Sequence, residues 1–226
     1  MSYSPLLAII TGFFEFAAAI FTFLNPGRKR ILYPVGLLFL LLAGYQFSEV
    51  AVCANPDNLL FSRIAFFDIT WLPPLALWLA YQLSPQKNKW LKAISLGYFT
   101  AGLFFAAWII MDPHIVTKSV CQLVLARYQN PNPFDTAYGI FYQIGLAVLI
   151  FAAAAIMAYA KDDILRKHMA NLQVGVLGFV LPSLAVRILT SESEGILPSV
   201  MCHFALVLAV SMCFMVMRER RLSQSN

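Results

Sequence analysis

Five ionisable side chains lie inside long apolar runs of this sequence, and they are the first candidates for chemistry. They are Glu15, Glu49, Asp68, Arg187 and His203. Ionisable groups are costly in hydrocarbon, so within membrane helices they usually face the interior of the bundle and mark a functional site. If consecutive runs cross the membrane in alternating directions, all except Glu15 lie between one and about two turns from the same side of the bundle, at about 3.6 residues per turn. We therefore expect these four at one depth of a helix bundle.

Helical spacing adds neighbours to this layer, because residues three or four apart share one face of a helix. The shared faces are Tyr45, Glu49 and Cys53; Asp68, Trp71 and Leu75; Ser183 and Arg187; and Ser199 and His203.

Two interpretations of these stripes stay open. In one, they line a polar pocket, and the guanidinium of Arg187 offers its fork of donors to an anionic or carbonyl-bearing group. The ligand-binding residues of such a pocket are Tyr45, Glu49, Asp68, Arg187 and His203. In the other, Arg187 neutralises Glu49 or Asp68, and the charges form a structural network without a ligand.

Other kinds of site are not predicted. The sequence has three histidines, His114, His168 and His203, of which His168 is expected in a loop, and no His-x-x-x-His or Cys-x-x-Cys spacing occurs. Such a set does not favour a metal site. A retinal Schiff base would need a lysine in the middle of an apolar run, and none is present there. No catalytic residue is assigned, and the cofactor is left unknown.

The composition requires a membrane. Apolar residues make up 60% of the 226 residues and charged residues only 12%, whereas soluble domains have roughly 45–50% and about 25%. The apolar residues form blocks of about 20, long enough to cross a hydrocarbon core. We predict an all-α, polytopic membrane protein forming one domain over residues 1–226, with seven transmembrane helices near 5–24, 33–53, 60–83, 90–111, 136–160, 170–190 and 197–217. Pro73 and Pro74 are expected to kink the third helix.

Lysine and arginine set the predicted orientation, because cytoplasmic loops hold the excess of both. Twelve lie on one side: Arg28, Lys29, Arg30, Lys87, Lys89, Lys92, Lys161, Arg166, Lys167, Arg218, Arg220 and Arg221. Arg63, Lys118 and Arg127 lie on the other. The N-terminus is therefore expected outside and the C-terminus in the cytoplasm of a plasma membrane, or a bacterial inner membrane. A cleaved signal peptide is disfavoured, because no basic residue precedes the first apolar run.

The connection between the fourth and fifth helices lies on the outer side. Val116, Val120, Leu123, Val124 and Arg127 have helical spacing, which predicts a short helix on the membrane surface; an irregular loop is the alternative. Cys121 in this connection and Cys53 at the outer end of the second helix both face an oxidising compartment, which favours a disulfide if their Cα atoms lie within about 7 Å. Cys202 and Cys213 are expected to be small packing residues.

Two stretches carry a resemblance. Gly44-Tyr45-Gln46-Phe47-Ser48-Glu49-Val50 resembles a Gln-Gln-x-x-Glu-Gly pattern, and residues 197–205 (Leu-Pro-Ser-Val-Met-Cys-His-Phe-Ala) resemble a Pro-Ser-Val-Trp-Cys-Phe-Phe-Ala pattern. Both patterns belong to a bacterial multi-helix membrane family of unknown function, from which this chain departs at Tyr45, Met201 and His203. The layout also resembles the seven-helix input regions of bacterial sensor kinases, although no kinase or other output domain is expected here. Neither resemblance implies an activity.

The function favoured by these features is a binding or sensing module. A small molecule or lipid would enter the polar pocket from outside, and a membrane or cytoplasmic protein partner would receive any signal. One alternative is an intramembrane enzyme acting on a lipid-like substrate, with Glu49 or Asp68 as acid or base and His203 as its partner. Another is a structural subunit of a membrane complex. The lipid bilayer is the expected environment, and nucleic acid is not an expected partner, because the net charge of +5 comes from basic residues at helix ends.

Overall fold

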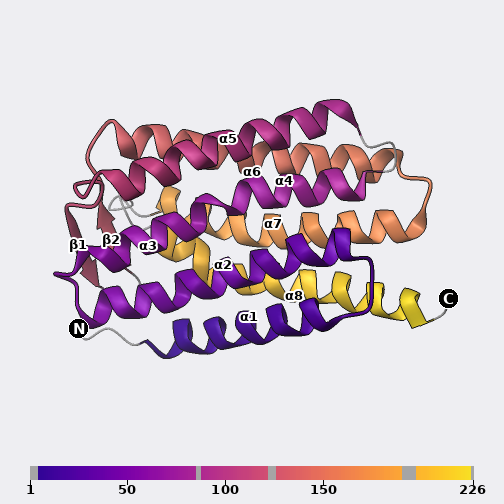
Figure 1. Cartoon of the computed structure of the whole chain (residues 1–226), viewed down its shortest axis with the longest axis horizontal. Coiled ribbons are helices and arrows are strands. Elements are labelled where there is room, and N and C mark those ends of the chain that lie inside the picture. Colours follow the sequence, from indigo (N-terminus) through magenta and orange to yellow (C-terminus); the bar gives the residue numbers. More distant parts are fainter. Residues whose placement is uncertain (1–4, 85–87, 122–125, 190–196, 225–226) are drawn as a thin grey trace.

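Helices running along one common axis dominate the computed structural model (Figure 1). The structure describes residues 5–84, 88–121, 126–189 and 197–224, and for residues 186–189, 197–199, 201 and 202 it describes the backbone alone. The helices are α1 (Leu6–Leu24), α2 (Lys29–Ala54), α3 (Leu59–Thr70), α4 (Leu72–Leu83), α5 (Lys89–Met111), α6 (Phe134–Tyr159), α7 (Asp163–Leu189) and α8 (Leu197–Gln224). Two short strands, β1 (Lys118–Cys121) and β2 (Ala126–Gln129), lie between α5 and α6.

Several of these helices are suited to a membrane. Within the described residues, six helical segments are long and apolar enough to cross one, with α3 and α4 counted together. Their outward faces carry large apolar side chains: Phe13 on α1, Phe104 on α5 and Phe151 on α6 are each more than half exposed. Such exposure would be a liability in water but suits contact with lipid.

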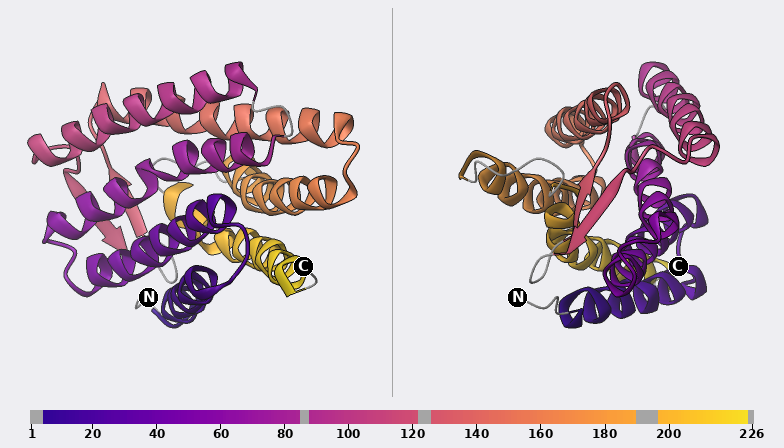
Figure 2. Two further views of the ribbon diagram at one scale, coloured as in Figure 1. Left: turned by 45° about the vertical axis from the view of Figure 1, so that its right-hand side comes forward. Right: turned by 90° about the vertical axis from the view of Figure 1, so that its left-hand side faces the viewer.

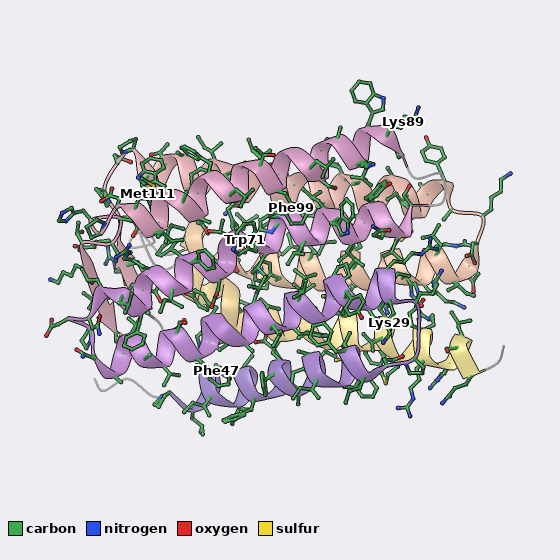
Figure 3. All side chains as sticks on the ribbon, viewed as in Figure 1. Lys29, Phe47, Trp71, Lys89, Phe99 and Met111 are labelled. Atoms are coloured by element: carbon green, nitrogen blue, oxygen red, sulfur yellow. A yellow bond between two sulfur atoms is a disulfide. The ribbon has the colours of Figure 1, made fainter. Side chains whose placement is uncertain are left out.

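The bundle has two distinct ends. The hairpin end holds β1, β2, the start of α1 and the end of α5, where Figure 3 labels Met111. The basic end holds Lys29, Lys89 and the end of α8. The two further views show the strands standing at one end of the helices and α8 crossing beneath α2 (Figure 2). Helix α2 is the central element, because it contacts α1, α3, α4, α8 and both strands.

The predicted kink is a break between two helices. Helix α3 ends at Thr70, and α4 begins at Leu72 after Trp71. Pro73 and Pro74 have no amide hydrogen, so the carbonyls one turn earlier lose their regular donors. The hydroxyl of Thr70 donates to the Phe66 carbonyl oxygen at 2.7 Å, and the hydroxyl of Tyr138 on α6 lies 3.3 Å from the same oxygen. Side chains therefore supply hydrogen bonds beside the break.

The predicted surface helix between α5 and α6 is wrong. Lys118–Cys121 pairs antiparallel with Ala126–Gln129, so that Val120 lies opposite Arg127. The helical spacing of the apolar residues was a coincidence in a short segment, and alternation decides the structure instead: in β1 the side chain of Ser119 is buried between two exposed neighbours. Ile115 and Val116, just before β1, are fully buried and hold the base of the hairpin against the bundle.

Candidate functional site

The centre of the predicted polar layer lies on α2. Tyr45 and Glu49 are one turn apart on the same face, and their side chains are 1% and 0% exposed. A buried carboxylate needs compensating polar groups because its transfer from water is costly. Both residues are therefore held inside the bundle in the half that leads to the hairpin end.

Asp68 approaches the same helix from α3. A Cβ atom at Gly44 would lie 2.6 Å from one carboxylate oxygen of Asp68, so a larger residue at this position would push the carboxyl group away from α2. Asp68 is half-buried, and among the described residues its carboxylate takes part in none of the hydrogen bonds or ion pairs. The structure thus brings Asp68 beside the residue that precedes Tyr45.

Trp71 does not share this site, contrary to the face predicted from its spacing. Its ring packs towards α5, where a Cβ atom at Gly102 would lie 3.6 Å from it, and it meets Phe67 edge to face. The helix break between Thr70 and Leu72 disrupts the regular turn on which the prediction depended. Asp68 and Trp71 therefore contact different helices.

The remaining predicted residues come from α7 and α8. His203 is half-buried on α8, which contacts α2. Ser183 is buried on α7, but its hydroxyl donates to the Phe179 carbonyl oxygen of its own helix at 2.8 Å. Arg187 lies in α7, but the structure describes only its backbone. The same holds for Ser199 and Cys202 in α8. Cys213 is a free thiol, partly buried on α8 as expected for a packing residue.

The hairpin covers the end of the bundle above this layer. The disulfide between Cys53 of α2 and Cys121 of β1 is present, with a Cα–Cα distance of 5.6 Å, which confirms the predicted pairing. The hydroxyls of Ser62 on α3 and Ser119 on β1 are 2.7 Å apart and buried. Strand β2 also contacts α8. The hairpin therefore forms a cap that is attached to α2, α3 and α8, and two of these helices carry Glu49 and His203.

Arg63 fixes the neighbouring helix end. Its guanidinium donates to the carbonyl oxygens of Ile109 at 3.0 and 2.8 Å and of Ile110 at 2.6 Å, in the last turn of α5. These carbonyls have no partner within their own helix, and a cation at a helix C-terminus is favourable. The start of α3, the end of α5 and the hairpin thus form one connected cap.

A second polar site lies at the basic end and was missed from the sequence. Glu219 on α8 is 1% exposed. Its carboxylate accepts from the Arg28 guanidinium at 2.8 and 2.5 Å, from the Arg28 backbone amide at 3.3 Å and from Nε2 of His168 at 2.6 Å. His168 was expected in a loop, but it is fully buried in the second turn of α7. One carboxylate therefore joins the α1–α2 turn, α7 and α8; we call these three residues the Glu219 junction.

The electrostatics of the Glu219 junction favour charge on the carboxylate. Burial alone would raise the pKa of Glu219, but the hydrogen bonds from Arg28 and His168 outweigh it and lower the pKa to about 2. The hydrogen bond to Glu219 in turn raises the pKa of Arg28. Nδ1 of His168 lies 3.4 Å from the Arg218 guanidinium, which can only donate. Nδ1 is thus the acceptor, and the Nε2 hydrogen faces Glu219.

Close packing fixes the Glu219 junction, and a cleft opens beside it. A Cβ atom at Gly27 would lie 2.8 Å from Cβ of Glu219 and 3.2 Å from its backbone carbonyl, so the α1–α2 turn can touch α8 only with glycine there. The cleft has a volume of about 430 Å³ and lies between this turn, the start of α7 and the end of α8, with Asp162 and Ser223 on its walls. It opens at the basic end of the bundle.

The two sites differ in what they can do. In the layer around Glu49, a carboxylate and a tyrosine hydroxyl are buried in the interior of the bundle. The Glu219 junction is internally satisfied and links helices. Within the part of the chain that the structure describes, no group of three metal-ligating side chains comes together.

Comparison with known proteins adds no assignment: no protein-family model matches the chain, and neither does any curated protein.

Proposed function

We propose that this chain is a seven-span plasma-membrane protein that binds a small molecule or lipid in its outward half and transmits binding to its cytoplasmic face. In this proposal the hairpin end faces outward and the basic end faces the cytoplasm. The disulfide supports this orientation because such bonds persist in oxidising compartments. The excess of lysine and arginine at the basic end supports it independently.

The observation that carries the proposal is the complete burial of Glu49 and Tyr45 below a covalently attached cap. Membrane proteins rarely keep a carboxylate inside the bundle without a role in binding or conduction. Asp68 adds a second acidic group at the same helix, and it makes no ion pair among the described residues. A ligand that offers hydrogen-bond donors or a positive charge would complement this set.

The Glu219 junction supports transmission to the opposite end. Helix α8 carries His203 in the outward half and Glu219 at the basic end, so a shift of α8 on ligand binding would act directly on the contacts with Arg28 and His168. The cleft beside the Glu219 junction is where a cytoplasmic partner would detect that shift.

Native mass spectrometry of protein purified in a mild detergent tests the binding function. We expect the wild type to retain a bound lipid or small molecule and Glu49→Gln to lose it, with occupancy lower by about tenfold or more, because a hydrogen bond to a charged group contributes roughly 1.5–3 kcal/mol. Asp57→Asn changes an exposed carboxylate near the hairpin end and should retain the adduct. A wild type without any adduct, together with a Glu49→Gln protein that unfolds, would instead assign Glu49 to a structural network.

A further inference from the structure

Glu15 is a second completely buried glutamate, and neither the polar layer nor the Glu219 junction includes it. It lies in the middle of the nineteen-residue helix α1, and its side chain is 0% exposed. Neither carboxyl oxygen has a hydrogen-bond partner among the residues that the structure describes. By contrast, the buried Glu219 accepts four hydrogen bonds at its two carboxylate oxygens.

The surroundings of Glu15 are tightly packed and uncharged. The buried face of α1 otherwise consists of small residues, Ala8, Thr11, Gly12, Ala18, Ala19 and Thr22. One turn before Glu15, a Cβ atom at Gly12 would lie 3.0 Å from the Phe47 ring and 3.2 Å from Cβ of Gln46. The hydroxyl of Thr22 is engaged with the Ala18 carbonyl oxygen at 2.7 Å. The close approach of α1 to α2 leaves this carboxyl group without a polar neighbour that bonds to it.

Among the residues that the structure describes, no charged side chain pairs with Glu15. Helix α1 packs against α2 and α8, whose described titratable side chains are Lys29, Arg30, Tyr33, Tyr45, Glu49, Cys53 (in the disulfide), His203, Cys213, Arg218, Glu219, Arg220 and Arg221. None of them forms a hydrogen bond or ion pair with Glu15. The basic members lie at the ends of their helices, away from the middle of α1.

We propose that Glu15 is a proton-binding site in the membrane interior, and that its bound proton allows α1 to pack against α2 and α8. An unpaired carboxylate in an apolar interior is far less stable than the neutral acid, so such a group takes up a proton instead of remaining charged. The proton can leave only when Glu15 becomes exposed to water or a cation replaces it. Packing of α1 is thereby linked to proton uptake.

The proposed proton at Glu15 makes the stability of the protein depend on pH in one definite direction. The folded state holds one proton at Glu15 that the unfolded chain, with Glu15 exposed to water, releases above the ordinary range of a glutamate, so the free energy of unfolding falls as pH rises. Glutamine resembles the protonated acid in shape and cannot ionise. Glu15→Gln should therefore remove this part of the pH dependence and leave the protein at least as stable as the wild type.

A hydrophobic carbodiimide tests the protonation state in the unmodified protein. Dicyclohexylcarbodiimide enters apolar regions and reacts with protonated carboxyl groups, and peptide mass spectrometry locates the product. We expect modification at Glu15 at neutral pH and none at Glu219, which is equally buried but ionised and hydrogen-bonded. Absence of modification at Glu15 under conditions that unfold nothing would overturn the proposal. Protection of Glu15 by sodium ions would assign a metal-cation site and would overturn it as well.

Thermal unfolding in lipid nanodiscs from about pH 6 to about pH 9 provides the second readout. The wild type should lose stability across this range relative to Glu15→Gln, and the gap should widen with pH. If Glu15→Gln is instead less stable than the wild type at every pH, Glu15 uses its negative charge in the folded protein and the assignment fails. Both readouts are independent of ligand binding near Glu49, so the two proposals can fail separately.

Discussion

We expect Glu219→Gln to destabilise the folded protein more than any other single replacement of a carboxylate at the basic end. The carboxylate accepts from Arg28 and His168 while it is almost completely buried. Glutamine keeps one acceptor oxygen but loses the charge, and its amide group would face donors. Removing one partner of a buried charged network leaves the other partner desolvated without compensation.

The size of the effect follows from the pKa of Glu219. This residue lies two positions beyond the predicted span 197–217. Hydrogen bonds from Arg28 and His168 overcome the opposing effect of burial and lower that pKa from 4.5 to about 2. At 1.36 kcal/mol for each pKa unit, ionised Glu219 contributes about 3 kcal/mol. Because the pKa is lower in the folded protein than in the unfolded chain, this contribution is complete above about pH 4.5 and is lost as pH falls towards 2.

Denaturation followed by intrinsic tryptophan fluorescence, in the same detergent for all variants, measures this quantity. Glu219→Gln should lower the free energy of unfolding at neutral pH by about 3 kcal/mol and should lack the acid-induced loss seen in the wild type. Asp163→Asn is the matched control, because Asp163 pairs with Lys167 at the same end but is 61% exposed, and exposed pairs contribute at most about 1 kcal/mol. A loss for Glu219→Gln no larger than for Asp163→Asn would refute the reasoning.

Two further replacements test the elements that hold the sites. Cys53→Ser removes the disulfide that anchors the hairpin and should lower the free energy of unfolding by about 2–4 kcal/mol in a denaturation experiment under non-reducing conditions. Reduction of the wild type should reproduce the loss. An unchanged denaturation midpoint would mean that the other contacts of the hairpin are sufficient to hold it. Gly27→Ala inserts a methyl group within 2.8 Å of Glu219 and should cost about 1–3 kcal/mol in the same assay, whereas Gly139→Ala, where nothing lies within 4 Å, should be tolerated.

Helix positions were predictable because the apolar blocks themselves define them. The ends of the predicted spans fall close to the observed ends of α1, α2, α5 and α6, since Pro, Asn and charge stop both the hydrophobic run and the helix. The Cys53–Cys121 pairing was predictable as well, because the predicted topology placed both cysteines on the outer side, where a disulfide can persist. These inferences depend on local composition and on the membrane alone.

The hairpin and the Glu219 junction were not predictable by such means. Val116, Val120 and Arg127 fit a helical face, but a segment of about ten residues is too short for spacing to exclude a strand. The Glu219 junction unites residues separated by 51 and 191 positions, and each has an ordinary explanation in the sequence: Arg28 and His168 as loop residues, Glu219 as one acid among arginines. That acid inside the run Arg218–Arg221 was the only available signal.

The three buried glutamates show why residue type alone could not separate the sites. Glu15, Glu49 and Glu219 are each at most 1% exposed, and all lie within helices. Their chemistry differs because their neighbours differ: small uncharged residues around Glu15, Tyr45 on the same face as Glu49, and two cationic or donor side chains at Glu219. The proton-binding acid proposed at Glu15, the ligand-binding group proposed at Glu49 and the structural anion at Glu219 are therefore three consequences of one side chain in three dielectric and hydrogen-bonding environments.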